Sequence, residues 1–372
     1  MDFFFKPKGI ALIGASANQL KGGYSILKNL NTGYQGRIYP VNPRYQEIEG
    51  LTCYDSVLQV PDPVDLAIVF VPALPAVQAV RDCARRGIKG VMIQSAGFSE
   101  TGATGKALKA ELIKIKEQTG IRVWGPNCMG LVDAVNRHVF SFVLPVIWDD
   151  GLMAGDVSLI VQSGMLSAGF LIDTVSHGTM GISKACSLGN KADVNECDVL
   201  EYLIDDPDTR VIGAYLESIP DGPRFLTACR KTDKPIVILK GGKSAKGAEA
   251  AMSHTASMAG NGAIVHNALT QVGVVEATDF KQMLDLCRTL AMYEHISLQG
   301  TGRIAVVTYS GGAGIVSSDF MDQTDLDAAR LSPETIGLLE EIYPEWMPPA
   351  NPVDLWPAIE KNGPETAYKK DF

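Results

Sequence analysis

The stretch GIALIGAS at residues 9–16 decides the fold of this chain, because a short apolar run leads directly into a loop of small residues. Two later stretches repeat the arrangement, VSLIVQSG at residues 157–164 and IAVVTYSGGAG at residues 304–314. Continuous apolar runs of this kind are typical of strands buried on both faces of a parallel sheet. The spacing of roughly 150 residues is a usual domain size and predicts three α/β domains.

The predicted domains cover residues 1–150, 151–298 and 301–372, and the last has room for only about half a domain. A chain of 372 residues exceeds what one hydrophobic core usually organises. Further apolar runs alternate with helix-like stretches, as in a doubly wound sheet. They are AIVFV (67–71), GVMIQ (90–94), VIGAYL (211–216) and PIVILK (235–240).

The composition favours a soluble, cytoplasmic protein. Hydrophobic residues make up 46% and charged residues 20%, and the net charge of -9 argues against nucleic acid or an anionic membrane as the main partner. The apolar start is too short for a signal peptide, and no segment reaches membrane-spanning length. Seven cysteines without a Cys-x-x-Cys pair predict reduced thiols and no metal site.

The carboxyl ends of the first domain's strands should share one edge, because right-handed crossovers make the strands parallel. Gly14, Ala15 and Ser16 follow the first strand and would offer backbone N–H groups to a phosphate. Later strands place further residues at this edge: Pro72, Ser95, Gly97 and Asn127. The glycines also fit a plainer interpretation as tight turns.

The second strand ends in Asn42-Pro43-Arg44, where an NAD enzyme usually has a carboxylate for the ribose hydroxyls. An arginine there pairs well with a ribose phosphate instead. CoA and NADP both carry such a phosphate, so the residues alone leave both ligands open.

His254 has the most unusual setting of the five histidines. It lies in SHTASMAG (253–260), after KGGKSAKG (240–247), among small residues that let a ligand approach closely. A neutral imidazole is a capable nucleophile. Glu217 stands just beyond a strand, on the expected functional edge, where it could fix the imidazole tautomer, and Ser163-Gly164 would open a phosphate-binding helix. Each residue also has a plainer interpretation. His254 would be an ordinary hydrogen-bonded histidine in a loop, Glu217 a solvated surface acid, and Ser163 a helix N-cap.

Together these segments resemble the nucleoside-diphosphate-forming acyl-CoA synthetases, the superfamily that includes ADP-forming acetyl-CoA synthetase and succinyl-CoA synthetase. SHTASMAG after KGGKS looks like the phosphohistidine segment. GPNCMG (125–130), SLGNKAD (187–193) and NPVD (351–354) add support in the same order along the chain.

The resemblance implies a Rossmann-like CoA-binding domain followed by flavodoxin-like domains, the last one truncated. His254 would be phosphorylated and Glu217 would orient it. The phosphate would be held at Ser163 and Gly164 and, in the third domain, at Gly311, Gly312 and Gly314. The implied CoA contacts are Gly14, Ala15, Ser16, Asn42, Arg44, Pro72, Ser95, Gly97 and Asn127.

The implied reaction is an acid–thiol ligation in which a carboxylic acid, CoA and ATP reversibly give acyl-CoA, ADP and phosphate through an acyl phosphate and phospho-His254. The nucleotide step needs ATP, Mg²⁺ and an ATP-grasp domain, for which no stretch is long enough. We therefore expect a fragment of a fused enzyme or a subunit of a homo- or hetero-oligomer. A small monocarboxylic acid is favoured, with acyl contacts near Gly97-Phe98 and Gly189-Asn190.

Two other classes of function stay open from the sequence. One is a non-catalytic CoA or acyl-CoA sensing module of a protein acetyltransferase, which would need only the first domain. The other is an NADP-dependent oxidoreductase, although nothing later in the chain supplies a hydride-transfer site. An ATP-grasp domain in the continuation of the gene would favour the synthetase, and an acyltransferase domain the sensor.

Overall fold

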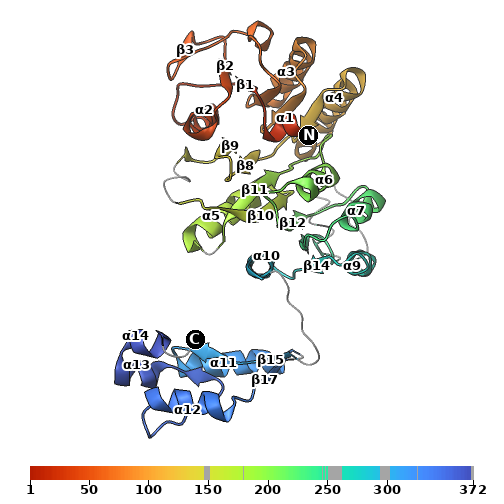
Figure 1. Ribbon diagram of the computed structural model, residues 1–372. Coiled ribbons are helices and arrows are strands. Elements are labelled where there is room, and N and C mark those ends of the chain that lie inside the picture. Colours follow the sequence, from red (N-terminus) through yellow and green to blue (C-terminus); the bar gives the residue numbers. More distant parts are fainter. Residues whose placement is uncertain are drawn as a thin grey trace. The chain divides into compact units, whose positions relative to one another are not determined.

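The computed structural model describes residues 1–145, 151–178, 180–244, 246–247, 249, 262–293, 302–324 and 326–369. The chain divides into two compact units, Met1–Glu294 and His295–Phe372. Both units combine helices with mainly parallel strands (Figure 1), so the predicted α/β class is confirmed. Among the described residues, no helix is both long and apolar enough to cross a bilayer.

The first sheet contains five parallel strands in the order β2-β1-β5-β6-β7. Their bounds are β1 Gly9–Ile13, β2 Arg37–Val41, β5 Leu66–Val69, β6 Gly90–Ile93 and β7 Arg122–Trp124. Neighbouring side chains point to opposite faces, so Ile10 packs with α2 (Gly22–Gly33), whereas Ala11 packs with α3 (Ala73–Arg86) and α4 (Ala103–Thr119). Short elements complete this part: α1 Asp2–Phe5, β3 Glu47–Ile48, β4 Leu51–Thr52, η1 Val57–Gln59 and η2 Ser99–Thr101.

The second sheet has seven strands in the order β14-β13-β12-β10-β11-β8-β9. The strands are β8 Leu131–Asp133, β9 His138–Phe140, β10 Ala154–Val161, β11 Ile182–Ser187, β12 Val211–Leu216, β13 Ile236–Lys240 and β14 Val275–Glu276. Its helices are α5 Gly164–His177, α6 Glu196–Asp205, α7 Gly222–Cys229, α9 Gly262–Thr270 and α10 Phe280–Met292. The five strands from β10 to β14 are parallel, with the chain order 2-1-3-4-5 of a flavodoxin-like sheet.

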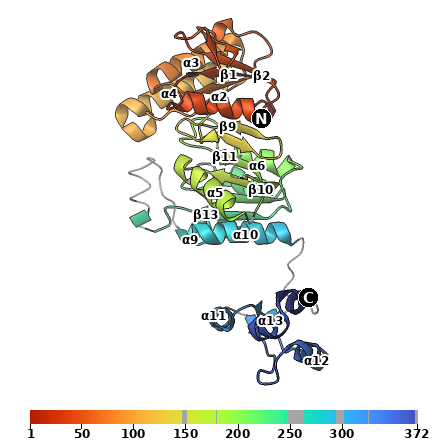
Figure 2. The ribbon, with the colours of Figure 1, turned by 90° about the vertical axis from the view of Figure 1, so that its left-hand side faces the viewer.

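Strands β8 and β9 come from residues that the sequence analysis counted with the first domain. They form an antiparallel hairpin, and β8 pairs with β11 at the edge of the second sheet. Helix α2 lies against β9 (Figure 2), and Asn29 Nδ2 donates to the backbone oxygens of Ser141 at 2.9 Å and Val143 at 2.7 Å. The three-domain division stays a prediction.

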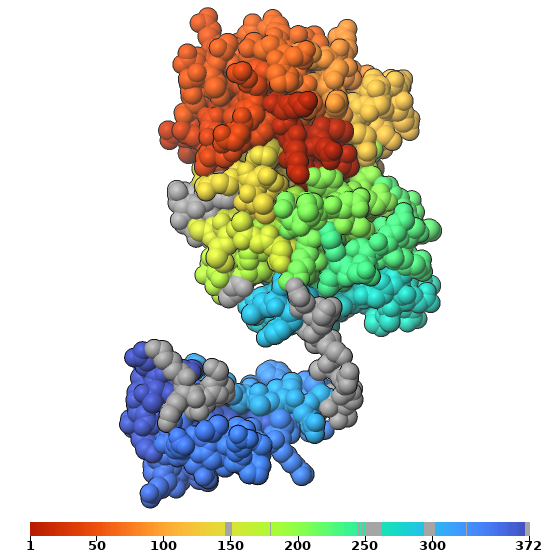
Figure 3. Space-filling model, viewed as in Figure 1, coloured from red at the N-terminus to blue at the C-terminus, as the bar shows by residue number. Residues whose placement is uncertain are grey.

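The two sheets share one continuous hydrophobic core, which contains both Ile10 of β1 and Ile212 of β12. The ring of Phe5 stacks on Tyr202 of α6 with centroids 3.7 Å apart, and Trp124 Nε1 donates to Ser187 O at 2.7 Å. Figure 3 shows an unbroken surface across this unit. The residues at the ends of both sheets are therefore held in a fixed relation.

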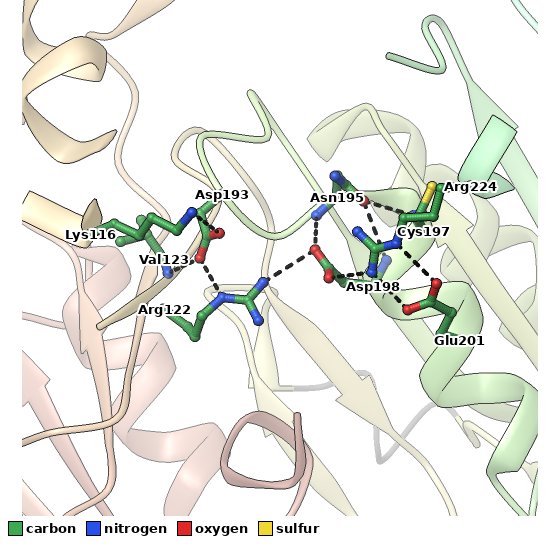
Figure 4. Close-up of polar contacts among 9 residues, drawn as sticks. All are labelled: Lys116, Arg122, Val123, Asp193, Asn195, Cys197, Asp198, Glu201 and Arg224. Carbon is green, nitrogen blue, oxygen red and sulfur yellow. Dashed lines mark hydrogen bonds and ion pairs between the residues drawn. The ribbon is translucent and has the colours of Figure 1, made fainter. Parts of the chain in front are cut away.

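Ion pairs also join the two sheets (Figure 4). Arg122 of β7 donates from Nε to Asp193 at 2.7 Å and from Nη2 to Asp198 at 3.2 Å. The backbone N–H of Val123 also donates to Asp193, and Arg224 donates to the other oxygen of Asp198 at 2.9 Å. Because the Asp193 side chain is only 6% exposed, these pairs are screened less than ordinary surface pairs.

The smaller unit has two short parallel pairs, β15-β17 and β16-β18. Its elements are β15 Gly302–Ile304, β16 Val307–Thr308, α11 Gly311–Asp322, β17 Leu326–Ala328, α12 Pro333–Ile342, β18 Val353–Asp354, α13 Trp356–Asn362 and α14 Pro364–Lys369. The third apolar run, predicted as one strand, is divided between two sheets. Asn351 accounts for the break, because its Oδ1 accepts from Val306 N at 2.9 Å while its Nδ2 donates to Ile304 O at 2.9 Å.

Candidate functional site

The carboxyl edge of the first sheet forms a cradle of closely packed backbone. Gly14 follows β1 with a φ of 93°, and a Cβ there would lie 2.4 Å from the backbone oxygen of Phe70. Asn42 Nδ2 donates to Ala15 O at 2.7 Å, and Ser16 Oγ accepts from Asn18 N at 3.0 Å. This is the point where the order of the parallel strands reverses, with β2 on one side of β1 and β5 on the other, and such switch points are the usual ligand sites of open α/β sheets.

The remaining predicted cofactor contacts of the first sheet lie along the same edge. Pro72 caps the start of α3, and Gly97, with a φ of 108°, follows β6. Ser95 Oγ is buried and has no hydrogen-bond partner among the described residues. Arg44 lies in the turn after β2 and is exposed, where it is accessible to a ribose phosphate.

A cavity of about 260 Å³ lies at the carboxyl edge of the second sheet. It brings together predicted residues of three kinds: the cofactor contact Asn127, the phosphate-binding Ser163 and Gly164, and the catalytic Glu217. Ser163 and Gly164 follow β10, and Glu217 follows β12, the neighbouring strand at the switch point. The first sheet supplies one wall and the second sheet the other.

The start of α5 faces this cavity. Ser163 is the N-cap and accepts from Leu166 N at 3.5 Å. A helix start carries further N–H groups without partners inside the helix, and the helix dipole adds positive potential there. A Cβ at Gly164 would lie 3.7 Å from Met129 N, at ordinary van der Waals distance, and the predicted phosphate-binding role of Ser163 and Gly164 stays a prediction.

Glu217 is 9% exposed and is held on several sides. Its N–H donates to Gln162 Oε1 at 2.9 Å, its backbone oxygen accepts from Lys240 Nζ at 2.7 Å, and its Oε1 accepts from Tyr215 at 3.4 Å. Its Oε2 is buried and has no partner among the described residues. An unpaired buried carboxylate oxygen is costly, so this atom fits a donor from elsewhere, such as an imidazole N–H.

The neighbouring titratable groups reflect the burial of this edge. Burial raises the pKa of Tyr215 to about 12, and the Glu217 carboxylate adds to the rise. Burial lowers the pKa of Lys240, and the nearby ammonium group of Lys191 acts in the same direction. Both groups hydrogen-bond to Glu217, which lines the cavity, and perturbed titratable groups are common close to sites that carry out chemistry.

Comparisons with known proteins show the family to which the two sheets of the larger unit belong. A family model described as a CoA binding domain matches residues 8–134, and one described as a succinyl-CoA ligase like flavodoxin domain matches residues 154–290. The chain is 39% identical to the alpha subunit of acetate–CoA ligase (ADP-forming) II of Pyrococcus furiosus, over 95% of this chain and 76% of that subunit. This chain belongs to the ADP-forming acyl-CoA synthetase family. The family resemblance predicted from the sequence is thereby confirmed.

Other relatives show how much of a family member this chain covers. It is 37% identical to acetate–CoA ligase (ADP-forming) II of Archaeoglobus fulgidus, over 99% of this chain but 54% of the relative. The solved acetyl-coenzyme A synthetase 1 of Ca. Korarchaeum cryptofilum, in complex with phosphate and ADP, superposes with a TM-score of 0.84 at 34% identity, covering 95% of this chain and 75% of that one. The chain thus spans about half of the longer curated relatives it matches.

The predicted glycine loop of the smaller unit lies at the start of α11. Gly311 approaches the Asp354 carboxylate, since a Cβ there would be 2.8 Å from Oδ2, and Gly314 packs against Pro352. Gly312 is exposed at the first turn. The structure therefore brings the SGGAG and NPVD segments together, and their predicted phosphate-binding role stays a prediction.

His254 lies outside the described residues, as do its neighbours from 250 to 261. Within the described ranges, no group of three or more His, Cys, Asp or Glu side chains is arranged to hold a metal ion. All seven cysteines of the chain are buried and free.

Sequence reasoning missed several residues that shape the site. Phe98, suggested as an acyl contact, is fully buried in the core with residues of α3 and α4, whereas Phe142 lines the cavity. Gln162 and Lys191 stood inside quoted motifs, but a one-dimensional pattern does not show where a side chain points. Glu100, which accepts from Gly97 N at 2.6 Å and from Asn190 Nδ2, ties the two predicted acyl-contact loops together.

Proposed function

We propose that this chain is the CoA-binding and phosphohistidine portion of an ADP-forming acyl-CoA synthetase. The reaction converts a carboxylic acid, CoA and ATP reversibly into acyl-CoA, ADP and phosphate. The observation that supports it most is the single cavity that joins Asn127 of the CoA side to the α5 start and Glu217. A CoA-sensing module would need the first sheet alone, and nothing in that function uses a buried carboxylate at the second.

The proposed steps, written towards ATP formation, use the residues as follows. A phosphate oxygen attacks the thioester carbonyl and CoA leaves as the thiolate, which gives an acyl phosphate. A nitrogen of the neutral His254 imidazole then attacks phosphorus, and the carboxylate leaves. A β-phosphate oxygen of ADP finally attacks the phosphohistidine, which restores neutral histidine and gives ATP. Glu217 Oε2 accepts the other ring N–H and stabilises the charged ring.

The charge of the transferred phosphoryl group needs preorganised donors. The N–H groups at the start of α5 are suited to this role beside Glu217. In our proposal the loop at Gly311, Gly312 and Gly314 is a second phosphate station. ATP, ADP and Mg²⁺ are bound by an ATP-grasp subunit or fused domain, which makes the active enzyme a homo- or hetero-oligomer or a longer chain.

The preferred substrate in this proposal is a small monocarboxylic acid. Phe142, Cys128 and Met165 give the cavity apolar lining, and such surfaces favour apolar acyl groups over a second carboxylate. The seven buried free thiols suit a reducing compartment, and we place the enzyme in the cytoplasm.

Phosphorylation of His254 is the test. The chain, with its ATP-grasp partner or in its longer parent, is incubated with labelled ATP and Mg²⁺, and acid-labile, base-stable phosphate is counted. We expect labelling that disappears in His254→Ala and persists in His266→Ala, whose ring is exposed and paired with Glu276 at 2.7 Å. Equal labelling in His254→Ala, or none in a folded wild-type complex, would overturn the proposal.

A further inference from the structure

Lys191 belongs to the SLGNKAD motif, and the proposed reaction assigns it no role. It lies in the loop between β11 and α6 and has a φ of 48°, in the left-handed region that non-glycine residues rarely adopt. Its side chain is only 6% exposed. A left-handed backbone at a non-glycine residue and a buried ammonium group each cost folding free energy. Such costs are usually kept where the residue has a structural or functional role.

The ammonium group of Lys191 is fully engaged with protein acceptors. It donates to Ser218 O at 2.8 Å, to Glu196 Oε2 at 2.9 Å, and to Gln162 Oε1 and Ser218 Oγ at 3.1 Å each. An ammonium has three N–H donors, and four acceptors surround this one. No donor is left for a ligand, so Lys191 acts through its neighbours.

Gln162 connects Lys191 to the catalytic carboxylate. Its Oε1 accepts from Lys191 and also from the backbone N–H groups of Glu217 at 2.9 Å and Ser218 at 3.1 Å. Three donors converge on one oxygen, which fixes the amide orientation, because a flipped amide would place its own N–H groups against them. Lys191 also holds the other side of the same segment at Ser218 O.

The backbone around Lys191 is anchored to the CoA side of the cavity. The N–H groups of Asn190 and Ala192 donate to Pro126 O and Gly125 O, each at 2.8 Å. Gly189 is packed so closely that a Cβ would lie 2.2 Å from Pro126 O. The loop therefore runs from the segment that carries Asn127 to the segment that carries Glu217.

We infer that Lys191 is a positioning residue that holds the Glu217 segment, through Gln162 and Ser218, in register with the CoA side of the cavity. This inference rests on the proposed function, because it assigns Glu217 to the phosphohistidine step. The Lys191 ammonium also pairs with the fully buried Glu196, which does not line the cavity, whereas Glu217 does.

The test is a double-mutant cycle of Lys191→Met and Gln162→Leu in the chain with its ATP-grasp partner or longer parent. We expect each single substitution to slow phosphorylation of His254 by at least about tenfold. The double variant should be no slower than the worse single variant, because residues that act in one chain of contacts are not additive. The Kd of CoA should stay within about twofold, since Lys191 donates to none of the proposed CoA contacts.

Lys109→Met is the matched control. Lys109 Nζ donates to Asn190 O at 2.6 Å on the other side of the same loop and does not contact the Glu217 segment. We expect this variant to phosphorylate His254 within about threefold of wild type. Three results would overturn the inference. The first is a double variant in which the two losses of phosphorylation rate multiply, and the second is a loss in Lys109→Met as large as that in Lys191→Met. The third is a CoA affinity that falls in parallel with the phosphorylation rate.

The two proposals fail in different ways. A wild-type complex that binds CoA but does not label His254 removes the proposed function and the inference together. A wild type that labels, with Lys191→Met labelling at the same rate, removes the inference alone. If Lys191→Met does not fold, Gln162→Leu and Ser218→Ala probe the same contacts from the acceptor side, and normal labelling in both contradicts the role.

Discussion

The two sheets of the larger unit have the same parallel strand order but very different carboxyl edges. At the first edge, the switch point between β1 and β5 is made of backbone: Gly14 packs on Phe70 O, and Asn42 holds the loop by one amide contact. At the second edge, the switch point between β10 and β12 is crowded with buried charges. The strand order decides where a site lies on a sheet, whereas the residues of the loops decide whether that site only binds a ligand or also carries out a reaction.

The physical cost of the two edges differs as well. At the first edge, two backbone segments approach each other closely, which requires little more than a glycine at the point of contact. Buried Lys191, Glu196, Glu217 and Lys240 each lose hydration that their partners must replace. Such charges are a common mark of a site in which charge moves. The first edge therefore fits a recognition surface, and the second a reaction site.

The largest effect should come from the second edge. Glu217→Gln keeps the shape of the side chain but removes the carboxylate that, in our proposal, contacts the phosphohistidine, and we expect about a 100-fold slower labelling of His254. The Kd of CoA should change by less than about threefold. Glu201→Gln, in a half-exposed ion pair with Arg224, is the matched control and should label normally. A loss of CoA binding in Glu217→Gln as large as the loss of labelling would contradict the assignment of binding to the first edge and reaction to the second.

A smaller effect is expected from the first edge. Gly14→Ala forces a Cβ to within 2.4 Å of Phe70 O and should weaken CoA binding by about tenfold. Gly87→Ala, also at a left-handed φ (82°) but with nothing within 4 Å, should cost about 1 kcal/mol of stability and leave CoA binding unchanged. Calorimetric titration of both variants with CoA separates the effect of the steric clash at residue 14 from that of the backbone strain, which both substitutions cause. Equal CoA affinities of the two variants would contradict a role for the close backbone packing at Gly14 in CoA binding.

The smallest effect concerns the contact between the edges, at Glu100. Burial would raise the pKa of Glu100, but hydrogen bonds from Asn190 and from nearby backbone N–H groups outweigh it, and the pKa is lowered. A lowered carboxyl pKa stabilises the fold above the unfolded pKa of about 4.3, and the stabilisation is lost as the pH falls through the folded pKa.

Denaturant unfolding across that acid range measures this contribution. Glu100→Gln should be less stable than wild type at pH 7, and the two should converge as the pH falls through the folded pKa. Glu111→Gln, in a half-exposed pair with Arg81, should follow the wild-type pH dependence. A constant difference between Glu100→Gln and wild type at every pH would show that the carboxylate charge is not responsible.

Much of the fold followed from local pattern. VIGAYL at residues 211–216 is strand β12 as predicted, because a continuous apolar run has no exposed face to disturb it. The prediction of one strand for the third apolar run was wrong. The N–H of Val306 donates to the side chain of Asn351, 45 residues away in the sequence, and not to a neighbouring strand. The β8-β9 hairpin was likewise missed, since its partner β11 lies far along the chain.

The sequence by itself determined the kinds of chemistry that this chain offers: glycine loops after apolar strands, an arginine where a ribose phosphate would bind, and motifs of the acyl-CoA synthetase family. Only the tertiary structure decided that Asn127, Gly164 and Glu217 share one cavity, and that Lys191 is turned towards Gln162. Strand-forming tendency is carried by neighbouring residues, whereas the direction of a buried side chain is set by partners from distant segments.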